Sequence, residues 1–111
     1  MNERVFDYPF AKIYALYVQK VTRKKRSVAE LDAVLSWLTG YAAAELHDNT
    51  QSLREFFAAA PMNPAAKQIT GVVCGVRVEN IADPLLQQIR WMDKVVDELA
   101  KGKAVAAIQR S

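Results

Sequence analysis

The residues best suited to chemistry in this sequence are five cations gathered in one short window. They are Lys20, Arg23, Lys24, Lys25 and Arg26. Clustered cations attract phosphate groups, either on nucleic acid or on a small ligand. The alternative interpretation is a solvated helix end whose charges complement the helix dipole and aid solubility. The sequence favours this alternative, because no aromatic residue lies between the cations to stack on a base.

Cys74 and His47 are the single cysteine and the single histidine of the chain. A nucleophilic or redox thiol needs a neighbouring base or cation to lower its pKa, and Arg77 is the nearest candidate in sequence. The apolar residues around Cys74 instead predict an ordinary buried free cysteine. We therefore predict no catalytic residue.

The sequence also contains few residues that could bind a metal ion. One cysteine and one histidine cannot form a structural zinc site, which takes four ligands, and the acids lack the spacing of a calcium loop. No metal and no cofactor is predicted. A small polar pocket formed by Arg77, Glu79 and Arg90 is one hypothesis, with Arg77 as the ligand-binding residue. An ion pair that holds the turn at Asp83 explains the same residues equally well.

Two glycine turns follow apolar segments, at Thr39-Gly40-Tyr41 and at Cys74-Gly75-Val76. Both resemble the turn of a helix-turn-helix, where glycine adopts the left-handed conformation at little cost. Recognition of bases needs Arg, Lys, Asn or Gln near the start of the second helix. Alanines follow the first turn, and Asp83-Pro84 ends any helix after the second. The turns therefore predict helix-to-helix corners, and sequence-specific DNA binding is not favoured.

Apolar spacing and capping residues predict the short helices that position these groups. Capping boxes begin at Ser27 and Ser52, and Asp83 followed by Pro84 opens the last long helix. The expected helices span about residues 9–26, 28–39, 41–47, 53–60, 84–101 and 103–110, with another beginning at Pro64.

The segment 69–78 is ambiguous, because it is rich in β-branched residues and glycine. We expect helix up to Cys74, since no other segment of the chain resembles a strand that would pair with it.

These patterns predict an all-α fold, a single-domain bundle (residues 1–111) of five to seven short helices with helix-turn-helix-like corners. A chain of 111 residues has room for one core. The expected core residues are Ile13, Tyr17, Leu31, Val34, Leu35, Leu38, Phe56, Phe57, Ile69, Val73, Ile81, Leu85, Ile89, Met92 and Val96.

The last long helix has an apolar stripe that is wide for a helix packed on one side only. Leu85, Ile89 and Met92 belong to a heptad-like seam, which Trp91 and Val95 widen. Such a stripe packs on the core of its own domain or covers a partner as well. Homodimerisation or binding of a protein partner through Trp91, Met92 and Val95 is therefore a hypothesis.

The composition excludes several classes of protein. The chain is 51% hydrophobic and 24% charged, which is typical of globular domains and argues against disorder. No apolar run approaches the roughly 20 residues that span a bilayer, and no signal-peptide pattern follows Met1. A single cysteine fits a reducing cytoplasm, so we expect a cytoplasmic protein without membrane contact. The net charge of +3 comes from the five clustered cations.

Four stretches occur in the same order as in a small bacterial family. They are Trp37–Tyr41, Cys74–Glu79 (Cys-Gly-Val-Arg-Val-Glu), Asp83–Leu85 and Asp97–Lys103 (Asp-Glu-Leu-Ala-Lys-Gly-Lys). The chain resembles domain-of-unknown-function family 2200 over almost its whole length. The resemblance implies a bacterial, single-domain, cytoplasmic protein and supplies no activity, ligand or catalytic residue.

The sequence leaves the function unknown. Its leading hypothesis is a small non-enzymatic interaction or oligomerisation domain, because the last helix is broadly apolar and no catalytic constellation is present. The alternative is a weak nucleic-acid-binding protein that uses the basic cluster 20–26.

Overall fold

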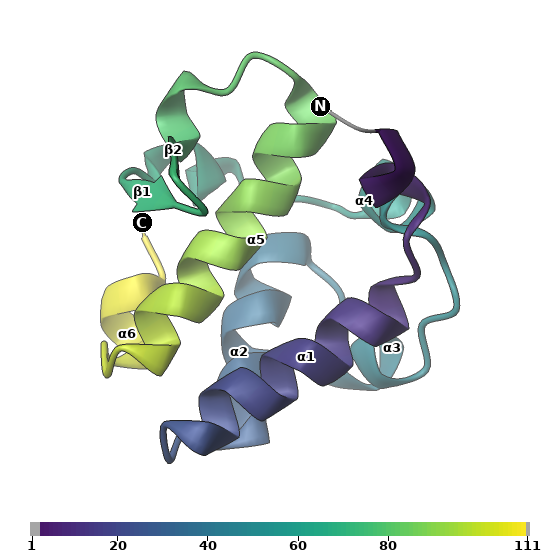
Figure 1. The fold of residues 1–111 in the computed structure, drawn as a ribbon. Helices are drawn as coiled ribbons and strands as arrows, with labels where there is room; N and C mark the ends of the chain where they lie inside the picture. Colours follow the sequence, from purple (N-terminus) through teal and green to yellow (C-terminus); the bar gives the residue numbers. More distant parts are fainter. Residues whose placement is uncertain (1–2, 111) are drawn as a thin grey trace.

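The computed structural model describes residues 3–110 and contains six α-helices around one hydrophobic core (Figure 1). The described helices, with three short 3-10 helices marked η, are η1 (Glu3–Asp7), α1 (Phe10–Arg23), α2 (Val28–Thr39), α3 (Ala43–His47), α4 (Leu53–Ala59), η2 (Pro64–Gln68), η3 (Val78–Asn80), α5 (Pro84–Ala100) and α6 (Val105–Ile108). The predicted class is confirmed: the fold is a mostly helical bundle.

Local sequence explains where the helices begin. The Ser27 side chain accepts from the amide of Glu30, and the Glu30 side chain accepts from the amide of Ser27, so the predicted capping box opens α2. Ser52 and Glu55 do the same for α4. Asp83 caps α5 through the amide of Leu86, with Pro84 at the first helical position.

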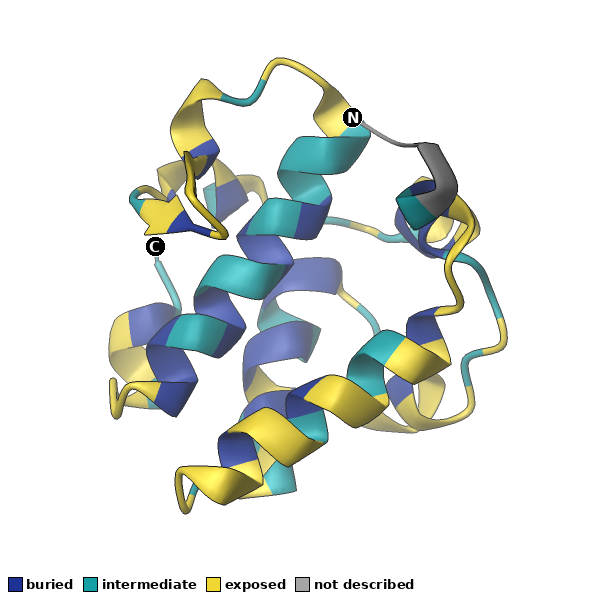
Figure 2. Ribbon diagram, in the orientation of Figure 1, coloured by how far each residue is buried: buried dark blue, intermediate teal, exposed yellow. Residues whose placement is uncertain are grey.

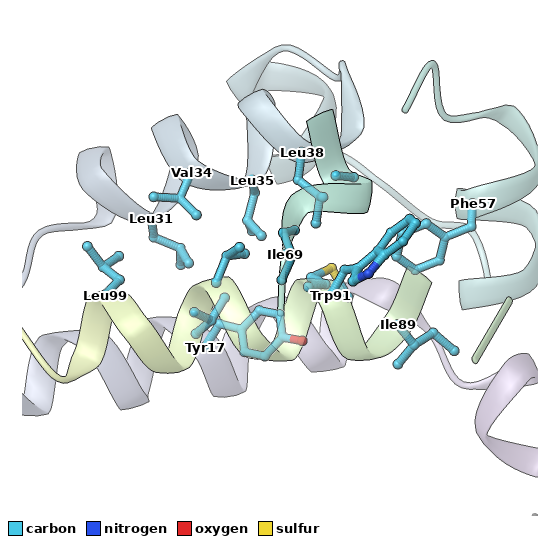
Figure 3. Packing of buried hydrophobic residues seen from close by; sticks show 14 of the residues in the cluster. Tyr17, Leu31, Val34, Leu35, Leu38, Phe57, Ile69, Ile89, Trp91 and Leu99 are labelled. Carbon is cyan, nitrogen blue, oxygen red and sulfur yellow. The ribbon is translucent and has the colours of Figure 1, made fainter. Parts of the chain in front are cut away.

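Helix α5 is the centre of the bundle. It packs against α1, α2, α4 and α6, and Figure 3 shows apolar side chains from α1, α2 and α5 meeting between these helices. Most of the predicted core is confirmed as buried, whereas Ile13, Ile81 and Leu85 remain half-exposed. Leu46, Val78 and Ile108 belong to the core but were not predicted there, because short segments carry too few residues to show a periodicity.

The prediction of helix up to Cys74 is wrong. Residues Val72–Val73 (β1) and Val76–Arg77 (β2) form a small antiparallel hairpin, with Val73 opposite Val76. Cys74 (φ 52°) and Gly75 (φ 79°) both adopt the left-handed conformation that a two-residue hairpin turn requires. The partner of the first strand is thus the segment directly after the turn. Backbone N–H and C=O groups of the two strands pair with each other, so a strand here does not leave all of these groups without partners.

The same turn corrects the expectation for Cys74. The residue lies at the hairpin tip and is exposed instead of buried. Val73 points toward α5 and is buried, while Val72 and Val76 are exposed. The apolar context therefore belongs to a hairpin that buries only one of its valines.

The structure also corrects the interface prediction for the last helix. Trp91 is 8% exposed, and Met92 and Val95 are fully buried in the core of their own domain. Burial of both sides of α5 explains the width of the apolar stripe, because α2 and α1 cover one part of it and α4, α6 and the hairpin cover the rest. Figure 2 shows that most of α5 is coloured as buried or intermediate, so little of this helix is open to a partner.

Candidate anion-binding end of the bundle

The turn between α1 and α2 presents three of the clustered cations to solvent. Arg23 is the last residue of α1, and Lys24 and Lys25 follow it; all three are exposed. The amide of Lys25 donates to the Thr22 carbonyl and that of Arg26 to the Val21 carbonyl, both at 2.9 Å. This is the Schellman ending of a helix, in which the residue at the position of Lys25 takes a left-handed conformation.

Lys25 occupies this position with a φ of 64°, where glycine is the usual residue. A side chain there costs about 1 kcal/mol relative to a relaxed conformation. We therefore expect Lys25→Gly to raise the free energy of unfolding by about 0.5 kcal/mol, the relief being partly offset by the greater freedom of glycine in the unfolded chain. Urea denaturation measures this change. A loss of stability would show that the lysine side chain makes contacts that outweigh its backbone strain.

Arg26 has a different role from its three neighbours. Its guanidinium donates to both carboxylate oxygens of Glu30, at 2.6 and 3.3 Å, and to the backbone carbonyls of Leu99 (3.2 Å) and Lys103 (3.0 Å). Arg26 thereby ties the α1–α2 turn to the C-terminal end of α5. Because its N–H donors are bonded to groups of the protein, Arg26 is not a free contact for a ligand.

Glu30 has a pKa lowered from 4.5 to about 2, first by the hydrogen bond from Arg26 and then by the amide of Ser27. Because its folded-state pKa lies below the unfolded value, Glu30 adds stability above about pH 4.5, which is lost as the pH falls toward 2. We expect Glu30→Gln to flatten the loss of thermal stability across this range. Calorimetric melting temperatures between pH 2 and 6 test this. An acid limb as steep as that of the wild type would contradict the assignment.

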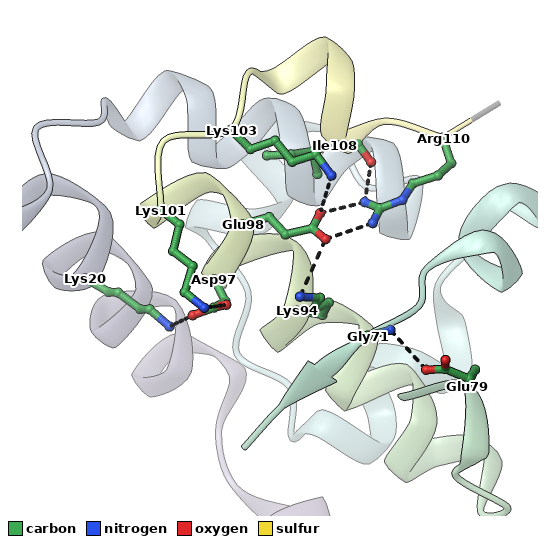
Figure 4. Close-up of polar contacts among 10 residues, drawn as sticks. All are labelled: Lys20, Gly71, Glu79, Lys94, Asp97, Glu98, Lys101, Lys103, Ile108 and Arg110. Carbon is green, nitrogen blue, oxygen red and sulfur yellow. Dashed lines mark hydrogen bonds and ion pairs between the residues drawn. The ribbon is translucent and has the colours of Figure 1, made fainter. Parts of the chain in front are cut away.

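Asp97 on α5 holds two further lysines near this turn. Its carboxylate lies 3.4 Å from the Lys20 ammonium and 3.1 Å from that of Lys101 (Figure 4). Burial raises the pKa of Asp97, but the hydrogen bond from Lys101 and the charges of Lys20 and Lys101 outweigh burial, so the net pKa is lowered. Asp97 is therefore ionised and offsets part of the local positive charge.

Glu98, the next residue, is a buried carboxylate that holds the C-terminal segment. It accepts two hydrogen bonds from Arg110, at 2.8 and 2.9 Å, and lies 3.7 Å from Lys94 and 3.9 Å from Lys103. Figure 4 shows the three cations converging on this single carboxylate. Lys103 is thereby placed at the turn between α5 and α6, the same turn whose carbonyls receive Arg26.

The two turns together form one strongly basic region, which we call the basic end. It consists of Lys20, Arg23, Lys24, Lys25, Arg26, Lys101 and Lys103. Three carboxylates pair with members of this set, namely Glu30, Asp97 and Glu98. Seven cations against three carboxylates leave a surplus of four positive charges. The basic end therefore joins the predicted cluster to lysines about 80 residues away in sequence, a proximity that the spacing alone could not show.

The helix dipoles do not account for this surplus. Helices α1 and α5 end at the basic end, and α2 and α6 begin there. Each terminus carries roughly half an elementary charge, so the two negative and two positive ends sum to about zero. Complementing the dipoles therefore accounts for little of the excess, and the solvated-helix-end interpretation leaves most of it unexplained. Among residues 5–110, whose side chains the structure describes, Arg23, Lys24 and Lys25 form no ion pair.

Arg77 does not join the basic end. It lies on β2, where its Nε is 3.5 Å from Glu79, and Glu79 accepts from the amide of Gly71. Arg90 pairs with Asp93 instead, at 2.9 Å, and the Tyr17 hydroxyl donates to the same carboxylate. The three residues of the predicted polar pocket thus belong to two separate contacts. No cavity is found among residues 3–110.

The structure contains one polar cluster that the sequence did not predict. Asp32, which is buried on α2, accepts from the Tyr14 hydroxyl at 2.6 Å and lies 2.7 Å from Nε2 of His47. Burial and the adjacent carboxylate raise the pKa of Tyr14. The cluster joins α1, α2 and α3, and no local pattern links residues so far apart in the chain. In the described part of the chain, no three potential metal ligands of the Cys, His, Asp or Glu types lie together.

The fold and the basic end define a small, mostly helical domain with one hydrophobic core and a cationic surface region at the basic end. This chain belongs to the bacterial family described as "Uncharacterized protein conserved in bacteria (DUF2200)", whose profile matches residues 4–110. The family predicted from the motifs is thus confirmed. A solved structure entitled "Crystal structure of uncharacterized protein SP1917" is similar, with 40% identity and a TM-score of 0.90. The alignment covers 97% of this chain and 92% of that one. No curated protein matches the chain. No helix among the described residues is long and apolar enough to cross a membrane.

Proposed function

We propose that this protein is a non-catalytic binding module of the cytoplasm that holds a polyanion at its basic end. The observation that carries the proposal is the convergence of the α1–α2 and α5–α6 turns, which leaves a surplus of four positive charges. A concentrated charge of one sign raises the local concentration of an oppositely charged partner and speeds its association.

The state of the individual side chains supports this assignment. Arg26 fixes the two turns relative to each other, and Glu98 holds Lys103 at the α5–α6 turn. Arg23, Lys24 and Lys25 extend from the α1–α2 turn into solvent. Lys25 has a left-handed backbone conformation, which is energetically unfavourable for a lysine. A rigid base with unpaired cations on it suits contact with an extended charged surface.

The experiment compares two double variants that remove the same charge from different places. Arg23→Ala with Lys24→Ala removes two cations of the basic end. Lys12→Ala with Lys67→Ala removes two exposed lysines elsewhere, on α1 and η2. Each protein is loaded on immobilised heparin at about 50 mM salt, and the salt concentration at elution is measured.

We expect the wild type to be retained, the Arg23/Lys24 variant to elute at clearly lower salt, and the Lys12/Lys67 variant to elute near the wild type. Equal shifts for the two variants would attribute retention to total charge and overturn the proposal. A wild type that passes through at low salt would do the same. Far-ultraviolet circular dichroism confirms that each variant is folded.

A further inference from the structure

We infer that the polyanion is duplex nucleic acid, held by its phosphates without recognition of base sequence. The inference rests on the proposed function and names the partner of the same basic end. It depends on the exposed cations of the basic end and on the kinds of side chain found near them.

A small phosphorylated ligand does not suit this surface. Among residues 3–110 there is no cavity to enclose one. Backbone amides at the start of a helix can bind a single phosphate, but at the start of α2 the Ser27–Glu30 capping box takes the amides of Ser27 and Glu30. It also places the Glu30 carboxylate there, whose charge opposes a phosphate. The exposed cations on the turn thus offer several separate contacts instead of one cradle, which suits a repeating polyanion.

A single strand does not suit it either. Proteins that hold single strands stack bases on exposed aromatic side chains, each worth roughly 1–3 kcal/mol. The described aromatic residue with the greatest exposure is Tyr8, just before α1, whereas the basic end lies at the opposite end of that 14-residue helix. At about 1.5 Å per residue the two are separated by roughly 20 Å.

An anionic membrane finds little to bind beyond charge. The large apolar side chains that are exposed among the described residues are Tyr8, Leu16, Val72 and Val76, of which Leu16 lies on α1, one helical turn before Lys20. A stable interfacial anchor needs a broad apolar face in addition to basic residues. One leucine does not provide such a face.

The two turns are close enough to act on one duplex. A single Arg26 side chain reaches Glu30 and the carbonyls of Leu99 and Lys103, so both turns lie within one arginine length of each other. Cations on both turns can therefore contact phosphates of one duplex, whose grooves are roughly 6 and 12 Å wide.

Among residues 3–110, the basic end has no element suited to the recognition of bases. Most of the cations lie on turns, and the corner at Gly40 is followed by α3, whose first residues Ala43, Ala44 and Glu45 are exposed but donate nothing to a base edge. The exposed His47 at the end of α3 lies 2.7 Å from Asp32 through Nε2. Contacts confined to phosphates position a protein on a duplex but carry no sequence information. We therefore expect binding that is independent of sequence.

The test titrates fluorescein-labelled 24-base-pair duplexes of two unrelated sequences with the full chain, and follows fluorescence anisotropy at several salt concentrations. Three free cations predict a slope of log K against log salt of about −3 for duplex. The two duplexes should bind within twofold of each other, and a single strand of equal length should bind at least fivefold more weakly. The protein should not co-sediment with vesicles of phosphatidylserine and phosphatidylcholine at the same salt concentration.

Two matched pairs of variants locate the site. Arg23→Ala with Lys24→Ala should reduce the magnitude of the slope by about 2, while Lys12→Ala with Lys67→Ala leaves it unchanged. Asp97→Asn should release Lys20 and Lys101 and steepen the slope to about −4.5, whereas Asp48→Asn, at the exposed end of α3, should not. Circular dichroism of Asp97→Asn checks that the gain of binding belongs to a folded protein.

Retention on heparin together with a single strand or the vesicles bound as tightly as duplex would overturn this inference and leave the proposed function standing. A sequence preference above tenfold would also overturn it. Loss of both heparin and duplex binding would overturn the two together.

Discussion

Replacing Gly40 by alanine is expected to lower the free energy of unfolding by about 3 kcal/mol or more. Gly40 ends α2 with a φ of 77°, and a Cβ atom there would lie 2.5 Å from both Cγ and the backbone oxygen of Pro61. The left-handed conformation alone costs about 1–2 kcal/mol for alanine. The contact with a backbone oxygen adds to this, because no side-chain rotation relieves it.

Gly75 provides a control with nearly the same backbone angle. Its φ is 79°, but a Cβ atom built there meets nothing within 4 Å. Gly75→Ala therefore isolates the conformational cost, and the difference between the two variants measures the clash with Pro61. Urea denaturation of both proteins gives the two values. Equal losses would show that the segment after α4 moves away from α2 at negligible cost.

Replacing Glu98 by alanine is expected to lower the free energy of unfolding by about 3 kcal/mol. The change leaves the Arg110 guanidinium without the carboxylate that accepts two of its hydrogen bonds, and it leaves Lys94 and Lys103 without their shared anion. Removing one partner of a buried ion pair is far more costly than removing an exposed pair, because unpaired charge remains away from water. Glu98→Gln keeps an acceptor and should lose less.

The loss should also be local. Glu98 connects α5 to the segment that contains α6, whose Ile108 is fully buried. Hydrogen exchange of amides 105–110 should accelerate in Glu98→Ala more than exchange in α2. Asp48→Asn, which alters an exposed acid, should leave both measurements unchanged. A cost below 1 kcal/mol would place Glu98 among ordinary surface ion pairs.

The site itself was predicted only in part. The cluster from Lys20 to Arg26 is a local run, so its position at the end of α1 followed from the helix pattern and its dipole. The separate role of Arg26 did not, because its acceptors are the carbonyls of Leu99 and Lys103. Pairing across the fold decides which cations remain free, and sequence spacing carries no record of it.

The sequence by itself determined the family, the helical class and the starts of α2, α4 and α5, because capping boxes and apolar periodicity act over a few residues. The tertiary structure decided the rest. It covered both sides of α5 and thereby removed the predicted interface at Trp91. It paired Val72–Val73 with the segment directly after the Cys74–Gly75 turn and brought Lys101 and Lys103 beside the α1–α2 turn. These outcomes depend on which surfaces meet, and that is fixed by packing of the whole core.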